Sequence, residues 1–342
     1  MIRILLLLML PFAAQAESLR IATFNTELSR DGPGLLLRDI RRGDPQVDAV
    51  VSVLAETKPD IVALQSIDWD LDGLALGALT QALDEAGLSY PFAFAAQPNA
   101  GLETGLDLDG DGKTGGPGDA QGWGKFTGQS GIAVLSRYPI RTGEARSLTS
   151  LLWRDLPGAT LPQVDGVPFP SKQAQEQQRL SSTAHWIVPI EAPGGLIDVL
   201  TFHATPPVFD GPEDRNGLRN ADEIRLWSLV LKGELGPSPK GRFVIAGDAN
   251  LDPNKGEGRK DAIRNLLDNT RLQDSKPLTP DGSPETVLWK GVGEMRVDYV
   301  LPSAGWQIAA SGIYWPKENT PGRKSAEAAS RHRLVWVDLV VE

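Results

Sequence analysis

The sequence predicts an α/β protein with two packed mixed sheets and outer helices. Short apolar runs typical of buried strands alternate with longer segments of helical periodicity. Predicted strands occur in both halves of the chain, and no composition change marks a linker between two cores. Several strands end in short polar motifs, which is where α/β sheets collect reactive groups.

The elements follow from local composition and spacing. Apolar and β-branched runs predict strands at residues 20–24, 61–64, 131–136, 180–190, 196–202, 243–246, 297–301, 308–315 and 334–341. Apolar residues at helical spacing predict helices at 47–56, 74–86, 220–232 and 259–267. Asp44 and Pro45 provide a cap and a first-turn proline for the first helix, and Gly87 ends the second. The Gly-rich stretch 101–131 and the Pro-rich stretch 156–170 predict long surface loops.

The first residues predict a signal peptide. Arg3 is positive, residues 4–12 are apolar, and Ala14-Gln15-Ala16 matches a cleavage pattern, so the mature chain is expected to start at Glu17. A membrane anchor is the alternative, but the apolar run is too short to span a bilayer. We expect a signal peptide at 1–16 and one domain at 17–342. The mature protein should be a periplasmic or secreted monomer without stable membrane insertion.

The composition limits the classes of function. The chain has 34 Lys and Arg against 44 Asp and Glu, and this acidic balance argues against strong non-specific binding of nucleic acid. A nuclease that uses divalent cations to offset phosphate charge remains compatible. The chain has no Cys, which excludes thiolate metal sites and Cys nucleophiles.

Six polar motifs lie at the ends of predicted strands. They are Thr23-Phe24-Asn25, Leu64-Gln65-Ser66, Phe202-His203, Gly247-Asp248-Ala249-Asn250, Arg296-Val297-Asp298-Tyr299 and Ser330-Arg331-His332-Arg333. Asp248 and Asn250 are two residues apart and so point to the same side, where they suit a hard cation and a phosphoryl oxygen. The Asn25 carboxamide can ligate a cation or orient a phosphate oxygen. An Asx turn or a cap is the alternative for these motifs.

Two imidazoles and a carboxylate complete the candidate site. His203 can stabilise charge on a phosphoryl oxygen. Asp298 lies among apolar neighbours, where an unpaired carboxylate is costly, and His332 is its natural partner. Such a pair fixes the imidazole tautomer, although a structural hydrogen bond is the alternative for His332. His185 matches no motif, so we expect it to be structural.

The order and type of the six motifs resemble the endonuclease/exonuclease/phosphatase superfamily, the deoxyribonuclease I-like phosphodiesterases, over roughly residues 19–341. The resemblance implies a four-layered α/β sandwich. It implies that Asn25 lies beside a metal ion, that Asp248 handles the nucleophilic water and that Asn250 binds the phosphate. It also implies that His203 stabilises phosphoryl charge and that the Asp298–His332 pair acts as a general base or a phosphate-stabilising dyad.

Two positions depart from the family pattern. Where the family has Glu, its principal magnesium ligand, this chain has Ser66, and where the family has an Asp before the His, it has Arg331. A hydroxyl cannot neutralise a divalent ion, and a guanidinium would repel it. One of Asp68, Asp70 and Asp72 could supply the missing charge, or Arg331 could replace the cation by contacting phosphate. Loss of phosphoryl transfer is the third option.

We therefore expect an extracytoplasmic hydrolase of phosphoric esters, a phosphodiesterase, nuclease or phosphatase, with cation-assisted in-line attack by water. The cation, Mg²⁺ or Mn²⁺, would be held by Asn25, Gln65, Asp68 and Asp248. The substrate, either nucleic acid or a small molecule or lipid head group with phosphate, would meet Asn25, Arg331 and Arg215. For Arg215 a solvated helix start is the favoured alternative. The alternative function is a catalytically deficient binding protein on the same scaffold.

A separate acidic motif predicts a calcium loop. In Asp107-Leu108-Asp109-Gly110-Asp111-Gly112, carboxylates recur at every second residue before a turn glycine. Gly118 stands where an EF-hand has its twelfth-position acid, and Asp119 follows it. We expect structural Ca²⁺ at Asp107, Asp109, Asp111 and Asp119, outside an EF-hand fold. An acidic, flexible turn is the alternative.

Overall fold

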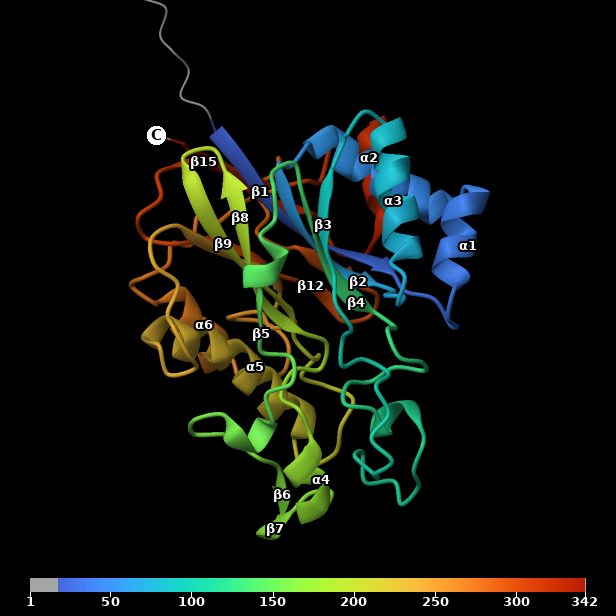
Figure 1. The fold of residues 1–342 in the computed structure, drawn as a ribbon, viewed down its shortest axis with the longest axis vertical. Helices are drawn as coiled ribbons and strands as arrows, with labels where there is room; N and C mark the ends of the chain where they lie inside the picture. The colour runs from blue at the N-terminus through green and yellow to red at the C-terminus, as the bar shows by residue number, and fades with distance from the viewer. Residues whose placement is uncertain (1–17, 342) are drawn as a thin grey trace, which may run out of the picture.

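Two β-sheets pack face to face, and helices cover both outer faces (Figure 1). The computed structural model describes residues 18–341, so the predicted signal peptide at 1–16 lies outside the described residues. Within 18–341, no helix is long and apolar enough to cross a membrane. The four-layered sandwich predicted from the sequence is confirmed.

The first sheet has the strand order β14-β15-β1-β2-β4-β3. Only its β1–β2 pairing is parallel among the described strands, so the sheet is mixed. In sheet order the strands are β14 (Ile308–Ile313), β15 (Val335–Val340), β1 (Ser18–Leu28), β2 (Ile61–Ile67), β4 (Gly131–Ser136) and β3 (Phe92–Phe94).

The second sheet has the order β13-β10-β9-β8-β5. Here β9 and β10 are parallel, and the other described pairings are antiparallel. In sheet order the strands are β13 (Asp298–Pro302), β10 (Phe243–Asp248), β9 (Gly195–His203), β8 (His185–Ala192) and β5 (Arg146–Ser147). Two small hairpins lie outside both sheets, formed by β6 (Gln163–Val164) with β7 (Val167–Pro168) and by β11 (Val287–Trp289) with β12 (Gly293–Met295).

Each helical layer buries an apolar stripe on its sheet. The first sheet carries α1 (Leu35–Arg42), α2 (Pro45–Thr57), α3 (Leu74–Glu85) and α7 (Pro321–Ala329). The second carries α5 (Arg215–Lys232) and α6 (Asp261–Leu267), and a short α4 (Lys172–Gln177) lies in a long loop. Between the sheets a third cluster packs Ile21 and Val134 against Trp186 and Val244. Burial on both faces explains why most of the strands read as nearly continuous apolar runs.

Local signals explain several helix boundaries. The Asp44 carboxylate accepts hydrogen bonds from the backbone N–H groups of Gln46 and Val47, so α2 has the predicted cap and first-turn proline and begins at Pro45, two residues before the predicted range. The predicted helix 220–232 begins earlier, at Arg215. The predicted strand 180–190 begins only at His185.

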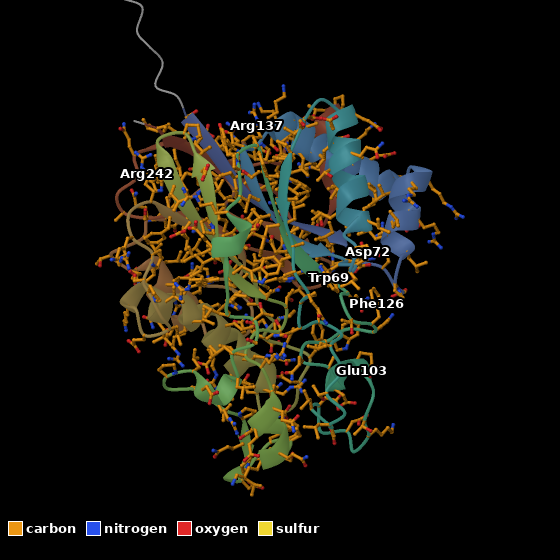
Figure 2. All side chains as sticks on the ribbon, viewed as in Figure 1. Trp69, Asp72, Glu103, Phe126, Arg137 and Arg242 are labelled. Carbon is orange, nitrogen blue, oxygen red and sulfur yellow. The ribbon has the colours of Figure 1, made fainter. Side chains whose placement is uncertain are left out.

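Two long loop regions extend from one end of the sheets (Figure 1). One connects β3 to β4, whose first residue, Gly131, pairs with Ile67 at the end of β2. The other leads into β8, whose first residue, His185, pairs with Phe202 near the end of β9. Arg137 and Arg242 lie at the opposite end, away from Glu103 and Phe126 (Figure 2). The long loops therefore adjoin the strand ends that carry the polar motifs.

Candidate active site

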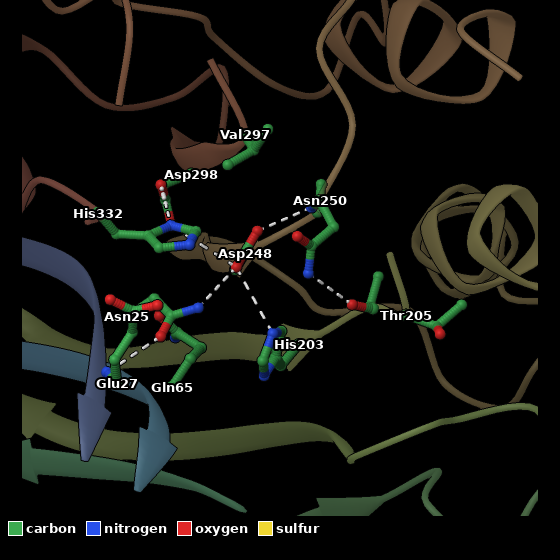
Figure 3. A network of polar contacts seen from close by, with 12 residues as sticks. Asn25, Glu27, Gln65, His203, Thr205, Asp248, Asn250, Val297, Asp298 and His332 are labelled. Carbon is green, nitrogen blue, oxygen red and sulfur yellow. Dashed lines mark hydrogen bonds and ion pairs between the residues drawn. The ribbon is translucent and has the colours of Figure 1, made fainter. Parts of the chain in front are cut away.

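Strand alternation directs the polar motifs into the space between the sheets. In β10, Val244 and Ala246 face the inter-sheet core, whereas Phe243 and Ile245 face the outer helices, and Asp248 continues the inter-sheet row. Asn25 continues the equivalent row of β1. The two side chains meet, and Asn25 Nδ2 donates to Asp248 Oδ2 at 2.9 Å (Figure 3).

Three further strands add residues by the same alternation. Gln65 continues the inter-sheet row of β2, His203 that of β9, and Asp298 that of β13. The site is therefore built from both sheets, at the carboxyl ends of β1, β2, β9 and β10 and at the start of the antiparallel β13. This is the crevice in which α/β folds place reactive groups.

Asp298 and His332 form the pair expected from the sequence. His332 Nδ1 lies 3.0 Å from Asp298 Oδ2 and 3.8 Å from Asp248 Oδ2, and all three side chains are buried. Burial alone would lower the pKa of His332, but the two carboxylates raise it to about 9. His332 is therefore an imidazolium near neutral pH. Its single positive charge faces both buried carboxylates and lies closer to Asp298.

Asp248 occupies the centre of the network. Burial, followed by the charge of Asp298, raises the pKa of Asp248, while His332 and the hydrogen bonds of Asn25 and Asn250 oppose this shift. A carboxyl with a raised pKa is suited to take a proton near neutral pH. Such perturbed groups concentrate at functional sites.

His203 is a neutral imidazole beside Asp248. Its Nε2 lies 3.5 Å from Asp248 Oδ2, and burial, with the charge of His332, lowers the pKa of His203 to about 3. Its buried Nδ1 has no hydrogen-bond partner among residues 18–341. Asn250 completes this side, because its backbone N–H donates to Asp248 Oδ1 at 2.7 Å and its Nδ2 donates to Ala204 O at 2.9 Å.

One acidic residue of the site, Glu27, was not predicted from the sequence. It lies two residues beyond Asn25 with a left-handed backbone (φ 50°), and its N–H donates to Asn25 Oδ1 at 3.2 Å. The Glu27 carboxylate accepts from Ser330 Oγ at 3.2 Å and from the Arg331 backbone N–H at 2.8 Å, and it pairs with the Arg331 guanidinium. Burial opposes ionisation, yet the Arg331 hydrogen bonds lower the pKa of Glu27 overall. A carboxylate just past a motif asparagine was the available signal.

The four predicted metal ligands are not arranged as a ligand set. Gln65 Oε1 accepts from Thr23 Oγ1 at 3.0 Å, and its buried Nε2, a donor, has no partner within the described chain. Asp68 is not in the acidic group that contains Asp248, and its two oxygens accept backbone N–H groups of Ser130 and Arg30 at 2.9 and 2.8 Å. Ser66 brings no charge. The position that the sequence resemblance assigns to magnesium therefore does not fit a divalent ion.

Asp70 and Asp72, the two other candidates for the missing negative charge at the metal position, do not supply it. Asp70 caps α3, because its oxygens accept the N–H groups of Leu74 and Ala75 at 2.8 Å. Asp72 is exposed. Among the described residues, two groups of acidic and imidazole side chains are close enough to hold a metal ion: Asp248 with Asp298 and His332, and Asp107 with Asp109 and Asp119.

Arg215 is separate from the polar network. Its Nη1 donates to Leu108 O, which ties α5 to the acidic loop. Arg215 lines a cavity of about 550 Å³ together with Thr205, Trp123 and Phe209. The cavity adjoins the site through Thr205, two residues after His203. Arg215 is the first residue of α5, as a helix start would be, but it is half-buried rather than solvated.

The acidic loop brings together three of its four predicted carboxylates. Ligand oxygens of Asp107, Asp109 and Asp119 lie within 4.8 Å of one another, and Asp111 is outside this group. Asp119 is buried and accepts the N–H groups of Leu108 and Gly116 at 2.9 Å. Calcium binding by this loop stays a prediction.

Several solved structures have a fold similar to that of this chain. An endonuclease/exonuclease/phosphatase from Beutenbergia cavernae superposes with a TM-score of 0.58 at 18% identity, covering 95% of this chain and 72% of that one. A family protein from Leptotrichia buccalis gives 0.55 at 16% identity, with 94% and 99% covered. Sphingomyelinase C from Streptomyces griseocarneus gives 0.51 at 18% identity, also with 94% and 99% covered.

Sequence comparison gives the family directly. No curated protein sequence is a significant match. The sequence profile of the endonuclease/exonuclease/phosphatase family matches residues 22–332. This range includes the first five polar motifs completely and the sixth up to His332. The chain belongs to the endonuclease/exonuclease/phosphatase family.

Proposed function

We propose that this protein hydrolyses phosphoric esters by cation-assisted in-line attack of water. The observation that carries the proposal is the convergence of Asp248, neutral His203 and the Asp298–His332 pair at one crevice between the sheets. Family membership supports the reaction class, because the family is generally hydrolytic. An Asp–His pair beside a second carboxylate offers both a proton acceptor and a positive group.

The side chains divide the chemistry between them. Asp248 accepts a proton from the attacking water, whose oxygen forms a bond to phosphorus as the bond to the leaving oxygen breaks. The His332 imidazolium, held by Asp298, stabilises negative charge on the phosphoryl oxygens. Gln65 Nε2 and the neutral His203 ring supply further polar contacts for those oxygens.

The assisting cation is either a divalent ion or a basic side chain. Members of this family typically use divalent cations, and Asp248, Asp298 and His332 are a group that could bind one. Mg²⁺ or Mn²⁺ would supply positive charge at the phosphoryl group. Arg331 is the side chain that could supply it instead.

We propose a periplasmic or secreted location, which rests on the signal-like residues 1–16, and a monomeric state. We also propose that the substrate is a phosphate-bearing small molecule, a lipid head group or nucleic acid. The formal net charge of −10 weighs against a large nucleic-acid footprint. These substrate classes share the phosphoryl group that the site would contact.

Hydrolysis assays on the mature chain from Glu17 test the function. Nucleic acids and generic phosphomonoesters and phosphodiesters are offered with magnesium, manganese, calcium or excess chelator. We expect activity that falls at least about 100-fold in His203→Ala and in Asp248→Ala. Asp72→Ala, which changes an exposed aspartate, is the matched control and should retain activity.

Absence of hydrolysis on every ester, with the protein shown to be folded, would contradict this function. It would favour the alternative function, a binding protein on the same scaffold. Ser66 and Arg331, which replace acidic residues of the family, are the reason for this alternative. Binding of phosphate without turnover would then be the expected property.

We propose structural Ca²⁺ at the acidic loop as a separate role. The grouping of Asp107, Asp109 and Asp119 supports it. Calcium should raise the melting temperature of the wild type, and Asp107→Asn should remove that rise. An equal rise in both proteins would contradict the assignment.

A further inference from the structure

The Glu27–Arg331 ion pair joins two motifs that are about 300 residues apart in the sequence. Arg331 Nε donates to Glu27 Oε1 at 2.6 Å, Nη2 pairs with the same oxygen, and the Arg331 backbone N–H donates to Oε2 at 2.8 Å. Backbone and side chain of Arg331 thus hold both oxygens of one carboxylate. Such charge-assisted contacts fix the direction of a guanidinium.

Neighbouring contacts fix this pair at the edge of the polar network. Ser330 Oγ donates to Asn25 O at 2.8 Å, and Asn25 in turn contacts Asp248. On the other side of Arg331 in the sequence, His332 contacts Asp298. Figure 3 shows Glu27 next to Asn25 and Gln65, on the His332 side of Asp248. The guanidinium is therefore tied to the same strand ends as the reacting groups.

One edge of the guanidinium remains open. Nε and Nη2 face Glu27, whereas Nη1 makes no hydrogen bond within residues 18–341, and 62% of the side chain is exposed. Arg331 lines a cavity of about 640 Å³ with Trp289 and Lys290 of the β11–β12 hairpin. The Trp289 ring lies 5.8 Å from the His332 ring, so the cavity lies beside the network.

The two amide side chains beside Glu27 have oxygens that already accept hydrogen bonds. Gln65 presents its unpartnered Nε2, because its oxygen is used by Thr23. The Asn25 oxygen is likewise used by the Glu27 N–H. Donors and a guanidinium suit an anionic oxygen, and they do not suit a divalent ion, which requires oxygen ligands.

Charge compensation leads to the same conclusion. Of the three carboxylates at the site, Glu27 is paired with Arg331 and Asp298 with His332, and only Asp248 lacks a full partner. A divalent ion next to Glu27 would have to displace the Arg331 guanidinium. Ser66 offers no charge in compensation.

We propose that Arg331, held by Glu27, replaces the divalent cation and binds the phosphoryl oxygens of the substrate directly, so that hydrolysis proceeds without a divalent ion. This inference rests on the proposed function and names its cation. Arg331 neither gives nor takes a proton. It contributes fixed positive charge and a planar pair of donors. Glu27 is a positioning residue that acts through Arg331.

The first test is chelation. The Asp107→Asn/Asp109→Asn variant, called the loop-disabled chain, lacks the acidic loop as a second metal site. Its rate of ester hydrolysis is measured in magnesium and in excess chelator. We expect rates equal within about twofold, since an intramolecular guanidinium is unaffected by chelation. A loss of tenfold or more in chelator, restored by magnesium in folded protein, would overturn the inference and leave the proposed function standing.

Variants of the ion pair test the residues. Arg331→Gln removes the charge, and Arg331→Lys keeps the charge but loses the planar fork, so both should raise KM for the ester about tenfold or more, with Arg331→Gln affected more. Glu27→Gln should also raise KM, because the Arg331 side chain would no longer be held in position. A merely structural Glu27 would lower the melting temperature and leave KM unchanged, which would contradict its positioning role.

Inorganic phosphate provides a readout independent of catalysis. Titration calorimetry on the loop-disabled chain should show phosphate binding, and this binding should weaken about tenfold in Arg331→Gln. The same chain should bind no magnesium at the site.

The matched control for magnesium is the loop-disabled chain with Ser66→Glu and Arg331→Asp, which restores the family acids. Its magnesium titration should show one site. Phosphate binding that does not depend on Arg331 would overturn the inference even if no ester is hydrolysed. Absence of hydrolysis together with Arg331-dependent phosphate binding would overturn only the proposed function.

Discussion

The charge of His332 depends mainly on its nearest carboxylate, Asp298. The carboxylates of Asp298 and Asp248 raise the pKa of His332 to about 9 against the opposing effect of burial. We predict that Asp298→Asn lowers this pKa by more than one unit, because the closest carboxylate is removed. Hydrolysis should fall by about two to four powers of ten as the imidazole loses its orientation.

NMR titration of the imidazole signals measures this pKa directly. The chain has three histidines, so single substitutions of His185 and His203 assign the spectrum. An unchanged His332 pKa in Asp298→Asn would mean that Asp248, at 3.8 Å, is the dominant partner.

At the residue scale, alternation along the strands explains which site residues could be found from the sequence. Five residues, Asn25, Gln65, His203, Asp248 and Asp298, lie at or within three residues of a strand end, on the inter-sheet face. Motifs at strand ends therefore place them together. Glu27 and its pairing with Arg331 could not be found this way. Glu27 itself has a left-handed backbone, and its partner comes from the other end of the chain.

At the scale of elements, Gly247 allows β9 and β10 to approach at the site. A Cβ at Gly247 would lie 2.4 Å from Phe202 O and 2.7 Å from the Phe202 ring. Gly247→Ala should therefore destabilise the protein by roughly 1–3 kcal/mol and reduce hydrolysis, because it displaces the neighbouring His203 and Asp248. Chemical denaturation measures the stability change.

Gly77→Ala is the matched control for that substitution. Gly77 lies in the exposed face of α3, and an added Cβ meets nothing within 4 Å. Alanine should stabilise the protein there by up to about 1 kcal/mol through helix propensity. Equal effects of the two substitutions would show that the β9–β10 approach is not tight.

A buried carboxylate on α5 holds the loop that leads toward the site. Asp222 Oδ2 accepts from Trp153 Nε1 and from the Thr160 N–H, both at 2.8 Å. Asp222→Ala leaves these donors unpaired and should cost on the order of 3 kcal/mol in the free energy of unfolding. Asp261→Ala, at an exposed aspartate on α6, should change it by less than about 0.5 kcal/mol. Comparable losses in the two variants would contradict this role of Asp222.

Several of the elements that sequence reasoning missed are short or weakly marked. Helix α1 has a glycine before it and no side-chain cap, so it lacks the start signal that identifies α2. The strands β5, β11 and β12 have two or three residues each, too few for a period to be visible. They form because longer neighbours or a hairpin partner hold them.

At the scale of the whole molecule, the two-sheet architecture could be predicted because burial on both faces leaves a simple pattern. Ile245 and Val244 are adjacent residues that face different cores, the outer one with α5 and the inner one between the sheets. A strand buried on both sides is apolar throughout. The order of strands in each sheet could not be predicted this way, because a continuous apolar run does not specify its neighbours.

Buried neutral histidines couple the stability of the whole fold to acidity. His185 Nε2 lies 3.0 Å from the Glu223 carbonyl oxygen and must donate to it, so Nδ1 accepts from Ser181 Oγ at 2.7 Å. Burial lowers the pKa of His185 to about 3. Between about pH 6.5 and 3 only the unfolded chain binds this proton, so the stability present above pH 6.5 is lost as the pH falls.

We predict that this loss amounts to about 1.4 kcal/mol per pH unit for His185. The His185→Gln variant cannot take up this proton in the unfolded state. Its free energy of unfolding should therefore fall less steeply between pH 6 and 4 than that of the wild type, by about 1.4 kcal/mol per pH unit. The contributions of other groups cancel in this comparison. Urea denaturation of both proteins at several pH values measures the two slopes. Parallel slopes would show that His185 is protonated in the folded protein at these pH values and that its pKa is not lowered by the core.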